Sequence, residues 1–181
     1  FTIHIQDPKV NFNNFNIIVA PEHDGIKGEN VINSKGAIHY ITEEEIEKSK
    51  TYLVDKVQSQ KVVALILGGP NKYYSFDNEE ISKIFNQIKE SFIYNGYKAI
   101  IVPSMRTPKK TIELAKKEFE NDGYVVTEVN KQAYLSSLAI ASNIVITCDS
   151  TSMISEAAIS GKPIFIAHMK NKRNNYRFKK F

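Results

Sequence analysis

The feature that most constrains this chain is the regular alternation of short apolar runs and amphipathic helical patterns between residues 62 and 167. The pattern predicts strands over 62–67, 98–102, 125–128, 143–147 and 163–167, and helices over 78–95, 107–121, 133–142 and 153–160. Repeated strand–helix–strand units build a parallel sheet, because each crossover helix packs back onto a face of the sheet. We therefore predict an α/β domain with helices on both faces of one parallel sheet.

The first 58 residues predict the end of a second α/β domain. Apolar runs at 1–5, 16–20 and 37–41 predict three further strands. Thr42 is placed to cap a helix that ends near Gln58, and Glu45 completes the capping box. We therefore divide the chain into 1–58, the last part of an amino-terminal domain with its linker helix, and 59–181, a Rossmann-like domain. The predicted buried strand already begins at the first residue, Phe1. We therefore expect further residues before it, and we expect both parts to belong to a longer protein.

Composition places the chain among folded proteins and narrows the classes of function. Hydrophobic residues make up 42% and charged residues 24% of the chain, which supports a packed core. The single cysteine, Cys148, excludes an internal disulfide, and no Cys and His spacing predicts a metal site. No apolar run approaches the roughly 20 residues that span a bilayer. We expect a soluble, cytoplasmic protein without a metal, and its wealth of Lys, Asn and Ile suggests a bacterial source.

The basic charge is concentrated at the carboxyl end. Residues 168–181 hold six of the 24 Lys and Arg residues and none of the 20 acidic residues, which leaves 18 basic against 20 acidic side chains elsewhere. Such a segment is most often a solvated terminus. The functional alternative is peripheral contact with an anionic membrane surface. We expect no specific binding of nucleic acid.

Two loops after predicted strands carry residues suited to an anionic ligand, because ligands of parallel sheets bind at the carboxyl ends of the strands. The turn that begins with Gly68 and Gly69 can bring backbone N–H groups close to phosphate oxygens, or it can simply reverse the chain. It matches neither a Walker loop nor a dinucleotide fingerprint. In the next loop, Ser104 and Arg106 precede a helix start and form an anion site, unless Thr107 is merely the helix cap.

The most informative loop runs from Cys148 to Ala157, with the sequence Cys-Asp-Ser-Thr-Ser-Met-Ile-Ser-Glu-Ala. Hydroxyl residues at 150–152 begin a helix, so they can offer side-chain donors and free N–H groups to a diphosphate. Glu156, one turn further, can accept hydrogen bonds from both hydroxyls of a ribose. Asp149 and Ser150 are also good helix caps, which is the structural alternative.

Taken in order, three motifs resemble the mitochondrial fission (elongated mitochondria) family: Ile-Leu-Gly-Gly-Pro-Asn at 66–71, Ser-x-Arg-Thr-Pro at 104–108, and Asp-Ser-x-Ser-Met-x-Ser-Glu-Ala at 149–157 followed by Gly-Lys-Pro at 161–163. The resemblance includes Gln-Asp-Pro at 6–8 and Pro-Glu-His-Asp at 21–24, and it covers residues 3–168. That family has a two-domain GT-B-like architecture related to nucleotide-sugar glycosyltransferases. The resemblance implies a metal-independent transferase of the GT-B type. It would move a sugar from a nucleoside diphosphate sugar to an acceptor such as a cell-envelope glycan or lipid, with no further cofactor.

The resemblance also implies roles for particular residues. Residues 1–58 would end the acceptor-side domain, and 59–181 would bind the nucleotide sugar and continue beyond the basic tail. The expected contacts of the nucleotide sugar are Gly68, Gly69, Ser104, Arg106, Asp149, Ser150, Ser152, Met153 and Glu156. Among these, Arg106 would neutralise the diphosphate as the sugar leaves.

On the acceptor side, His23 is the expected general base with Asp24 to orient it, and Glu22 is an equal candidate. A polar loop or a hinge network is the structural alternative for these three residues, and we expect His4 and His39 to be structural. Two other functions stay open. These are a non-catalytic scaffold linked to membrane fission and a nucleotide-sugar epimerase.

Overall fold

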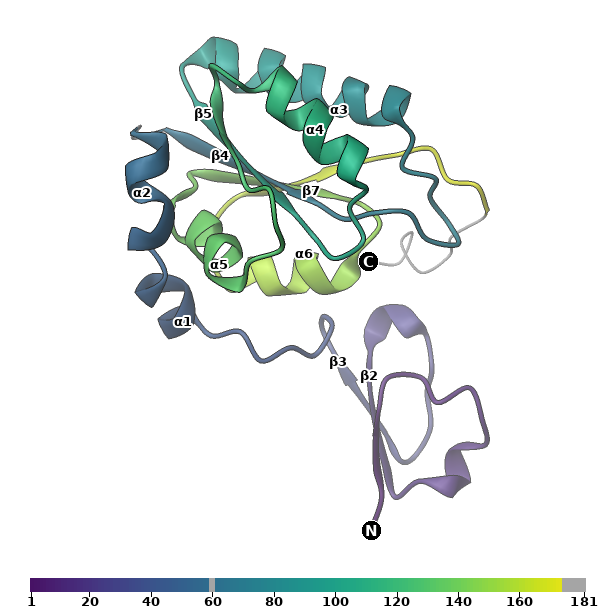
Figure 1. Ribbon diagram of the computed structural model, residues 1–181. Helices are drawn as coiled ribbons and strands as arrows, with labels where there is room; N and C mark the ends of the chain where they lie inside the picture. The colour runs from purple at the N-terminus through teal and green to yellow at the C-terminus, as the bar shows by residue number, and fades with distance from the viewer. Residues whose placement is uncertain (59–60, 174–181) are drawn as a thin grey trace.

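The computed structural model describes residues 1–58 and 61–173. Its larger unit is a parallel five-stranded sheet in the order β6-β5-β4-β7-β8, which confirms the predicted sheet (Figure 1). The strands are β4 (Val62–Leu67), β5 (Lys98–Pro103), β6 (Gly123–Val125), β7 (Asn143–Thr147) and β8 (Ile164–Ala167). Helices α3 (Asn78–Ser91) and α4 (Lys109–Glu118) cover one face. The other face carries α1 (Glu43–Lys48), α2 (Thr51–Val57), α5 (Lys131–Ile140) and α6 (Thr151–Ala158).

Strand β4 forms the centre of the core, and its side chains alternate between the two layers. Val62, Ala64 and Ile66 pack among the residues of α1, α2, α5 and α6. Val63, Leu65 and Leu67 pack instead against α3 and α4. None of the six is more than 2% exposed. A continuous apolar run is typical of a parallel strand that is covered on both faces, which is why the sequence predicts this strand so well.

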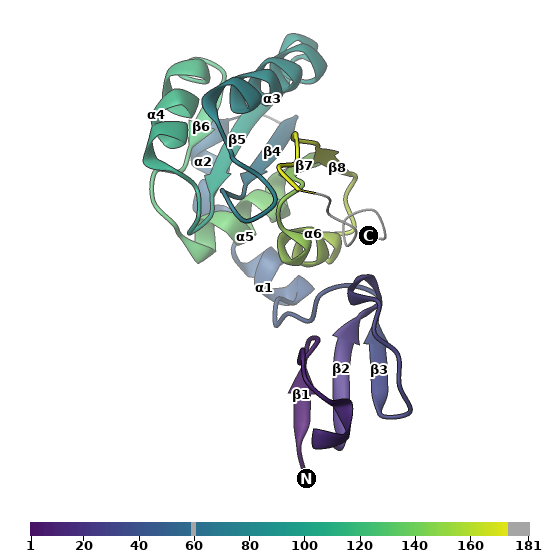
Figure 2. The same cartoon turned by 90° about the vertical axis from the view of Figure 1, so that its right-hand side faces the viewer.

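A smaller parallel sheet lies apart from the larger one, in the order β1-β2-β3 (Figure 2). It consists of β1 (Ile3–Ile5), β2 (Ile17–Pro21) and β3 (Val31–Ser34), with short 3-10 turns at η1 (Phe12–Asn14) and η2 (Glu22–Asp24). One face is packed, since Ile18 and Ala20 are fully buried. The other face is open, because Ile3, Ile5 and Ile32 are each more than half exposed.

The segment that joins the two sheets differs from the prediction. The predicted strand at 37–41 is wrong, since the third strand is β3 and the chain from 35 to 42 is irregular. The backbone N–H of Ala37 donates to Ser155 Oγ of α6 over 2.9 Å, so this stretch contacts a helix and does not extend a sheet. A Cβ on Gly36 would lie 2.6 Å from the same oxygen, which explains the glycine.

The predicted linker helix is divided into α1 and α2. Thr42 does cap α1, because its side chain accepts from the N–H of Glu45. The Glu45 carboxylate pairs with Lys131 of α5 at 2.9 Å, and both Lys131 and the backbone N–H of Thr42 lower its pKa, so the capping-box residue also ties α1 to α5. Ile46 and Leu53 belong to the core of the larger unit, so both short helices pack with it. The division of the chain at residue 58 stays a prediction.

Smaller differences concern the ends of elements. Strand β6 begins at Gly123 and not at Val125, because Gly123 pairs with Ala99 of β5. A Cβ on Gly123 would lie 2.0 Å from the Ala99 carbonyl oxygen, so the glycine is needed inside the strand. Helices α5 and α6 each begin two residues earlier than predicted, and α4 begins two residues later, with Pro108 as its cap residue. Within the described residues, no helix is long and apolar enough to cross a membrane.

Candidate functional site

The order of the large sheet predicts where a ligand can bind. Strands β5 and β6 lie on one side of β4, whereas β7 and β8 lie on the other. The chain therefore passes from β4 to β5 on one side and from β7 to β8 on the other, although β4 and β7 are neighbours. In parallel sheets, ligands bind at the carboxyl ends of two such strands, where their loops diverge. These loops are residues 68–71 and 148–150, two of the three that the sequence singles out.

Asp149 joins the three loops at this point. Its carboxylate is fully buried, and its Oδ2 accepts from the N–H of Gly69 at 3.0 Å and from Nη2 of Arg106 at 2.8 Å. Its Oδ1 accepts from the hydroxyl of Thr147 at 2.7 Å. A buried carboxylate that holds three donors is satisfied by the protein itself. Asp149 therefore positions the Arg106 guanidinium, and Thr147 contributes a contact that the sequence does not predict.

The two glycines allow the loops to pack closely. A Cβ on Gly68 would lie 2.1 Å from Oδ2 of Asp149, and one on Gly69 would lie 2.1 Å from the carbonyl oxygen of Arg106. The N–H of Gly68 donates to Thr147 Oγ1 at 2.8 Å, and that of Gly69 donates to Asp149. Both N–H groups thus have partners within the protein, and contact of these glycines with phosphate oxygens stays a prediction. The glycines position Arg106 and Asp149.

Arg106 is the side chain of this cluster that reaches solvent. Its Nη1 donates to the Gly69 carbonyl oxygen at 3.0 Å and its Nη2 donates to Asp149, while 40% of the side chain is exposed. These bonds use two of the five N–H donors of a guanidinium. Thr107 is not the helix cap, since its hydroxyl donates to the Leu67 carbonyl oxygen at 3.0 Å and accepts from the N–H of Ser104.

Helix α6 begins beside this cluster. Ser150 is its N-cap, and the Ser150 hydroxyl accepts from the N–H of Met153 at 3.4 Å. Ser152 is exposed in the first turn, and Met153 is half-buried. The first N–H groups of a helix have no partner within the helix and give this end a partial positive charge. The start of α6 therefore offers donors next to the Arg106 guanidinium.

Glu156 is held by a residue from a different helix. The hydroxyl of Tyr134 on α5 donates to Oε2 of Glu156 over 2.9 Å. Burial raises the pKa of Tyr134, and the negative charge of Glu156 raises it further, so the phenol stays protonated as a donor. The two residues are 22 positions apart on separate helices, so no local pattern in the sequence predicts the pair.

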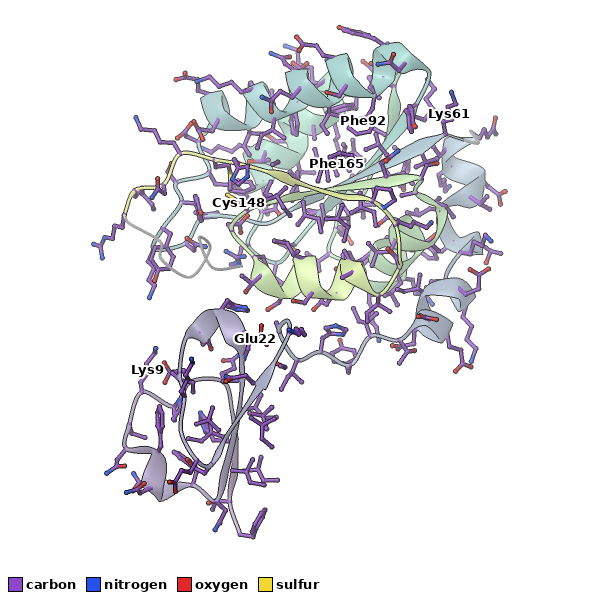
Figure 3. The ribbon with its side chains drawn as sticks, turned by 180° about the vertical axis from the view of Figure 1, so that it is seen from behind. Lys9, Glu22, Lys61, Phe92, Cys148 and Phe165 are labelled. Carbon is purple, nitrogen blue, oxygen red and sulfur yellow. The ribbon has the colours of Figure 1, made fainter. Side chains whose placement is uncertain are left out.

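The residues expected on the acceptor side lie on η2, and two of them, Glu22 and His23, line a cavity of about 480 Å³ between the small unit and α6. Figure 3 shows Glu22 on the edge of the small unit that faces α6. His23 is buried, and its Nε2 lies 3.9 Å from Oδ1 of Asp24. Glu22 pairs with Lys35 at 3.3 Å. The structure thus brings Glu22 and His23 to α6, along the side of the helix that carries Ser155 and not at Arg106.

No group of three or more His, Cys, Asp or Glu side chains within residues 1–58 and 61–173 is arranged to hold a metal ion. The basic segment at 174–181 lies outside the described residues. What the described part defines is a Rossmann-like α/β protein with a partly exposed arginine held at the carboxyl ends of β4 and β7 and a second parallel unit beside the large sheet.

This chain belongs to the Mitochondrial fission ELM1 family, whose model matches residues 1–181. It is 31% identical over 165 residues to the Rickettsia prowazekii (strain Madrid E) protein RP120, covering 83% of this chain and 44% of that protein. It is 22% identical over 193 residues to the Mitochondrial fission protein ELM1 of Arabidopsis thaliana, covering 92% of this chain and 45% of that protein. The chain therefore spans less than half the length of these curated relatives. The resemblance seen in the sequence is confirmed.

Proposed function

We propose that this chain carries the donor site, and part of the acceptor site, of a glycosyltransferase that uses a nucleoside diphosphate sugar. The observation that carries the proposal is the Arg106 guanidinium. It is fixed by the buried Asp149 carboxylate and by the Gly69 carbonyl, yet partly exposed at the carboxyl end of the sheet. A cation held in place before the ligand arrives stabilises a leaving diphosphate without reorganisation.

The donor lies across the start of α6. Its diphosphate meets Arg106 and the free N–H groups of the first helical turn, with the hydroxyls of Ser150 and Ser152 nearby. Its ribose hydroxyls meet Glu156, whose carboxylate is oriented by the hydrogen bond from Tyr134. This placement uses the expected binding residues in the loops after β5 and β7, while Gly68, Gly69 and Asp149 act by holding Arg106.

The transfer step exchanges one bond for another. The acceptor hydroxyl gives its proton to His23 while its oxygen bonds to the anomeric carbon of the sugar. The bond between that carbon and the phosphate oxygen breaks, and the nucleoside diphosphate leaves with the electron pair. Asp24, 3.9 Å from His23, stabilises the imidazolium that forms, and Arg106 stabilises the charge on the leaving group. Glu22 is the alternative base.

A thermal-shift panel with uridine, guanosine, cytidine and adenosine diphosphates tests the donor site. A ligand that binds the folded state alone stabilises it by about 2.7 kcal/mol at a hundredfold excess over Kd. We expect one nucleotide to raise the Tm of the wild type. We expect Arg106→Ala and Glu156→Ala to remove the shift and Lys110→Ala, an exposed cation of α4, to retain it. A folded wild type that no diphosphate shifts would refute the proposal.

One observation favours a second function, that of a non-catalytic partner-binding scaffold. The open face of the small sheet carries three exposed isoleucines, Ile3, Ile5 and Ile32. Ile3 and Ile5 are two positions apart on β1, so they point to the same face. Val19 of β2 pairs with both Ile5 and Ile32, which puts Ile32 on that face as well. Exposed apolar patches often mark protein or membrane contacts. The Arabidopsis thaliana relative is named for mitochondrial fission, a process of membranes. A scaffold would bind no nucleoside diphosphate, so the same panel separates the two functions.

A further inference from the structure

The cavity between the small unit and α6 has features of a ligand site in its own right. Its volume of about 480 Å³ falls within the range of about 300–1,000 Å³ that small-molecule sites occupy. It is built by η2, by the irregular segment after β3, and by one side of α6. The lining residues that carry the following argument are Glu22, His23, Lys35, His39, Ile154 and Ala158.

The charges that face this cavity are balanced. Glu22 and Lys35 pair with one another at 3.3 Å, and His23 lies 3.9 Å from Asp24. An anionic ligand would meet the Glu22 carboxylate, and a cationic ligand would meet the Lys35 ammonium. The cavity therefore has no excess charge of either sign to offset the desolvation of a charged ligand. An uncharged ligand avoids that cost.

His39 supplies an unused polar atom. Its Nδ1 is buried and has no hydrogen-bond partner among the residues that the structure describes. Buried polar atoms in folded proteins are nearly always paired, so an orphan at the wall of a cavity calls for a partner from outside the chain. A hydroxyl group suits either tautomer of the imidazole, because it can donate or accept. The sequence expectation that His39 is purely structural does not account for this atom.

The opposite wall is apolar. Ile154 and Ala158 are one turn apart on α6 and line the cavity together with Ile159. Ser155 does not add a free polar group, since its hydroxyl donates to the Thr151 carbonyl oxygen and accepts from the N–H of Ala37. A ligand of this cavity must therefore present hydroxyl groups toward His39 and a C–H surface toward α6.

We propose that this cavity binds an uncharged, polyhydroxylated ring, a sugar unit of the acceptor, with hydroxyls at His39 and its C–H face on Ile154 and Ala158. Only one part of this assignment rests on the proposed function, namely that the bound sugar is the acceptor of the transferase. The hydroxyl that reacts lies on the side of His23. His39 is then a binding residue that sets which acceptor ring is taken, and not a second base.

Binding of simple methyl glycosides to the intact protein tests this assignment. Methyl α-glucoside, methyl α-mannoside and methyl N-acetyl-β-glucosaminide are titrated at millimolar concentration, and the amide NMR signals of Gly36, Ala37 and Ser155 are followed. We expect at least one glycoside to shift these signals. Glucose 6-phosphate and glucosamine, which carry a charge, should bind more weakly than the neutral glycoside.

Three variants locate the site. His39→Ala should weaken the binding of that glycoside about fivefold, the loss expected for one hydrogen bond. Ala158→Arg, at an exposed helix position, should fill the cavity and abolish binding without harm to the fold. Gln87→Arg is the matched control, because it adds the same side chain to an exposed position of α3. Binding that survives Ala158→Arg, or no shift of these amides with any of the three glycosides, would overturn the assignment.

The Arg106→Ala variant separates this inference from the proposed function. We expect it to lose nucleoside diphosphate binding and to keep glycoside binding with an unchanged Kd. If glycosides bind and diphosphates do not, the transferase proposal fails while the sugar site stands. If diphosphates bind and glycosides do not, the sugar site fails while the donor site stands.

Discussion

Tyr134 should make the free energy of unfolding depend on pH in the alkaline range. Its pKa in the folded protein is raised, first by burial and then by the charge of Glu156, to which its hydroxyl donates. In the unfolded chain a tyrosine ionises near its ordinary pKa of about 10. The folded state therefore keeps a proton that the unfolded state loses. The stabilisation from the protonated Tyr134 is therefore fully present below about pH 10. It is lost as the pH rises from that value through the raised pKa of the folded protein.

The size of the effect follows from proton linkage. One proton held by the folded state alone lowers the free energy of unfolding by about 1.4 kcal/mol for each pH unit above the pKa of the unfolded state. Between pH 8 and pH 11.5 the Tyr134 contribution should therefore fall by about 2 kcal/mol. Other tyrosines and lysines also titrate in this range. They are the same in the wild type and in Tyr134→Phe, so the difference between the two proteins isolates one phenol.

Urea unfolding at a series of pH values measures that difference. The wild type should be more stable than Tyr134→Phe near pH 8, and the gap should shrink by about 2 kcal/mol at pH 11.5. Tyr94→Phe controls for the loss of a phenol, because Tyr94 is 75% exposed. A gap that does not change with pH, or the same pH dependence for both variants, would show that Glu156 and burial do not hold the Tyr134 proton.

Three further changes test the packing that supports the site, each by urea unfolding. Gly68→Ala should lower the free energy of unfolding by about 1–3 kcal/mol, because its Cβ would lie 2.1 Å from the Asp149 carboxylate. Phe85→Ala, at a fully buried position, should cost about 3–5 kcal/mol and leave the affinity for nucleoside diphosphate unchanged. Gly36→Ala should cost about 1–2 kcal/mol through contact with the Ser155 hydroxyl. Adding Ser155→Ala should recover part of that loss, so additive costs would contradict the contact.

The strands that the sequence predicts best are those that are buried on both faces. The bounds of β4 and β7 match the prediction, because a parallel strand at the centre of a sheet must be apolar at nearly every position. The edge strand β6 begins two residues earlier and ends three residues earlier than predicted, and its first residue, Gly123, carries no apolar signal. A glycine is required at position 123 because a Cβ would clash with the Ala99 carbonyl oxygen of the neighbouring strand. A local sequence pattern cannot show such a contact between strands.

The small unit shows a similar limit. The sequence places β1 and β2 well, but it puts the third strand at 37–41 and overlooks β3. Ile38 and Ile41 give that segment an apolar pattern, yet Ile41 is buried in the core of the larger unit beside α1 and α2. The apolar pattern reports burial correctly at Ile41 but not at Ile38, which is 48% exposed. It does not say against which partner the residues are buried.

The gathering of the site residues was predictable, whereas their roles were not. Gly69, Arg106 and Asp149 follow β4, β5 and β7, and the carboxyl ends of neighbouring parallel strands meet at one edge of the sheet. The division of labour among them depends on which atoms face each other. Asp149 and Arg106 are 43 positions apart, so the sequence cannot show that the Asp149 carboxylate accepts a hydrogen bond from the Arg106 guanidinium.

The two halves of the candidate site are held by contacts of different strength. Arg106 is fixed by a buried carboxylate and by a backbone carbonyl at the edge of one sheet, so the proposed donor side is organised before a ligand arrives. The base candidate His23 belongs to the small unit, where the segment after β3 meets α6 through the hydrogen bond from Ala37 to Ser155. A change at Ser155 should therefore alter the position of the acceptor side and leave nucleotide affinity intact. A change at Asp149 should do the reverse.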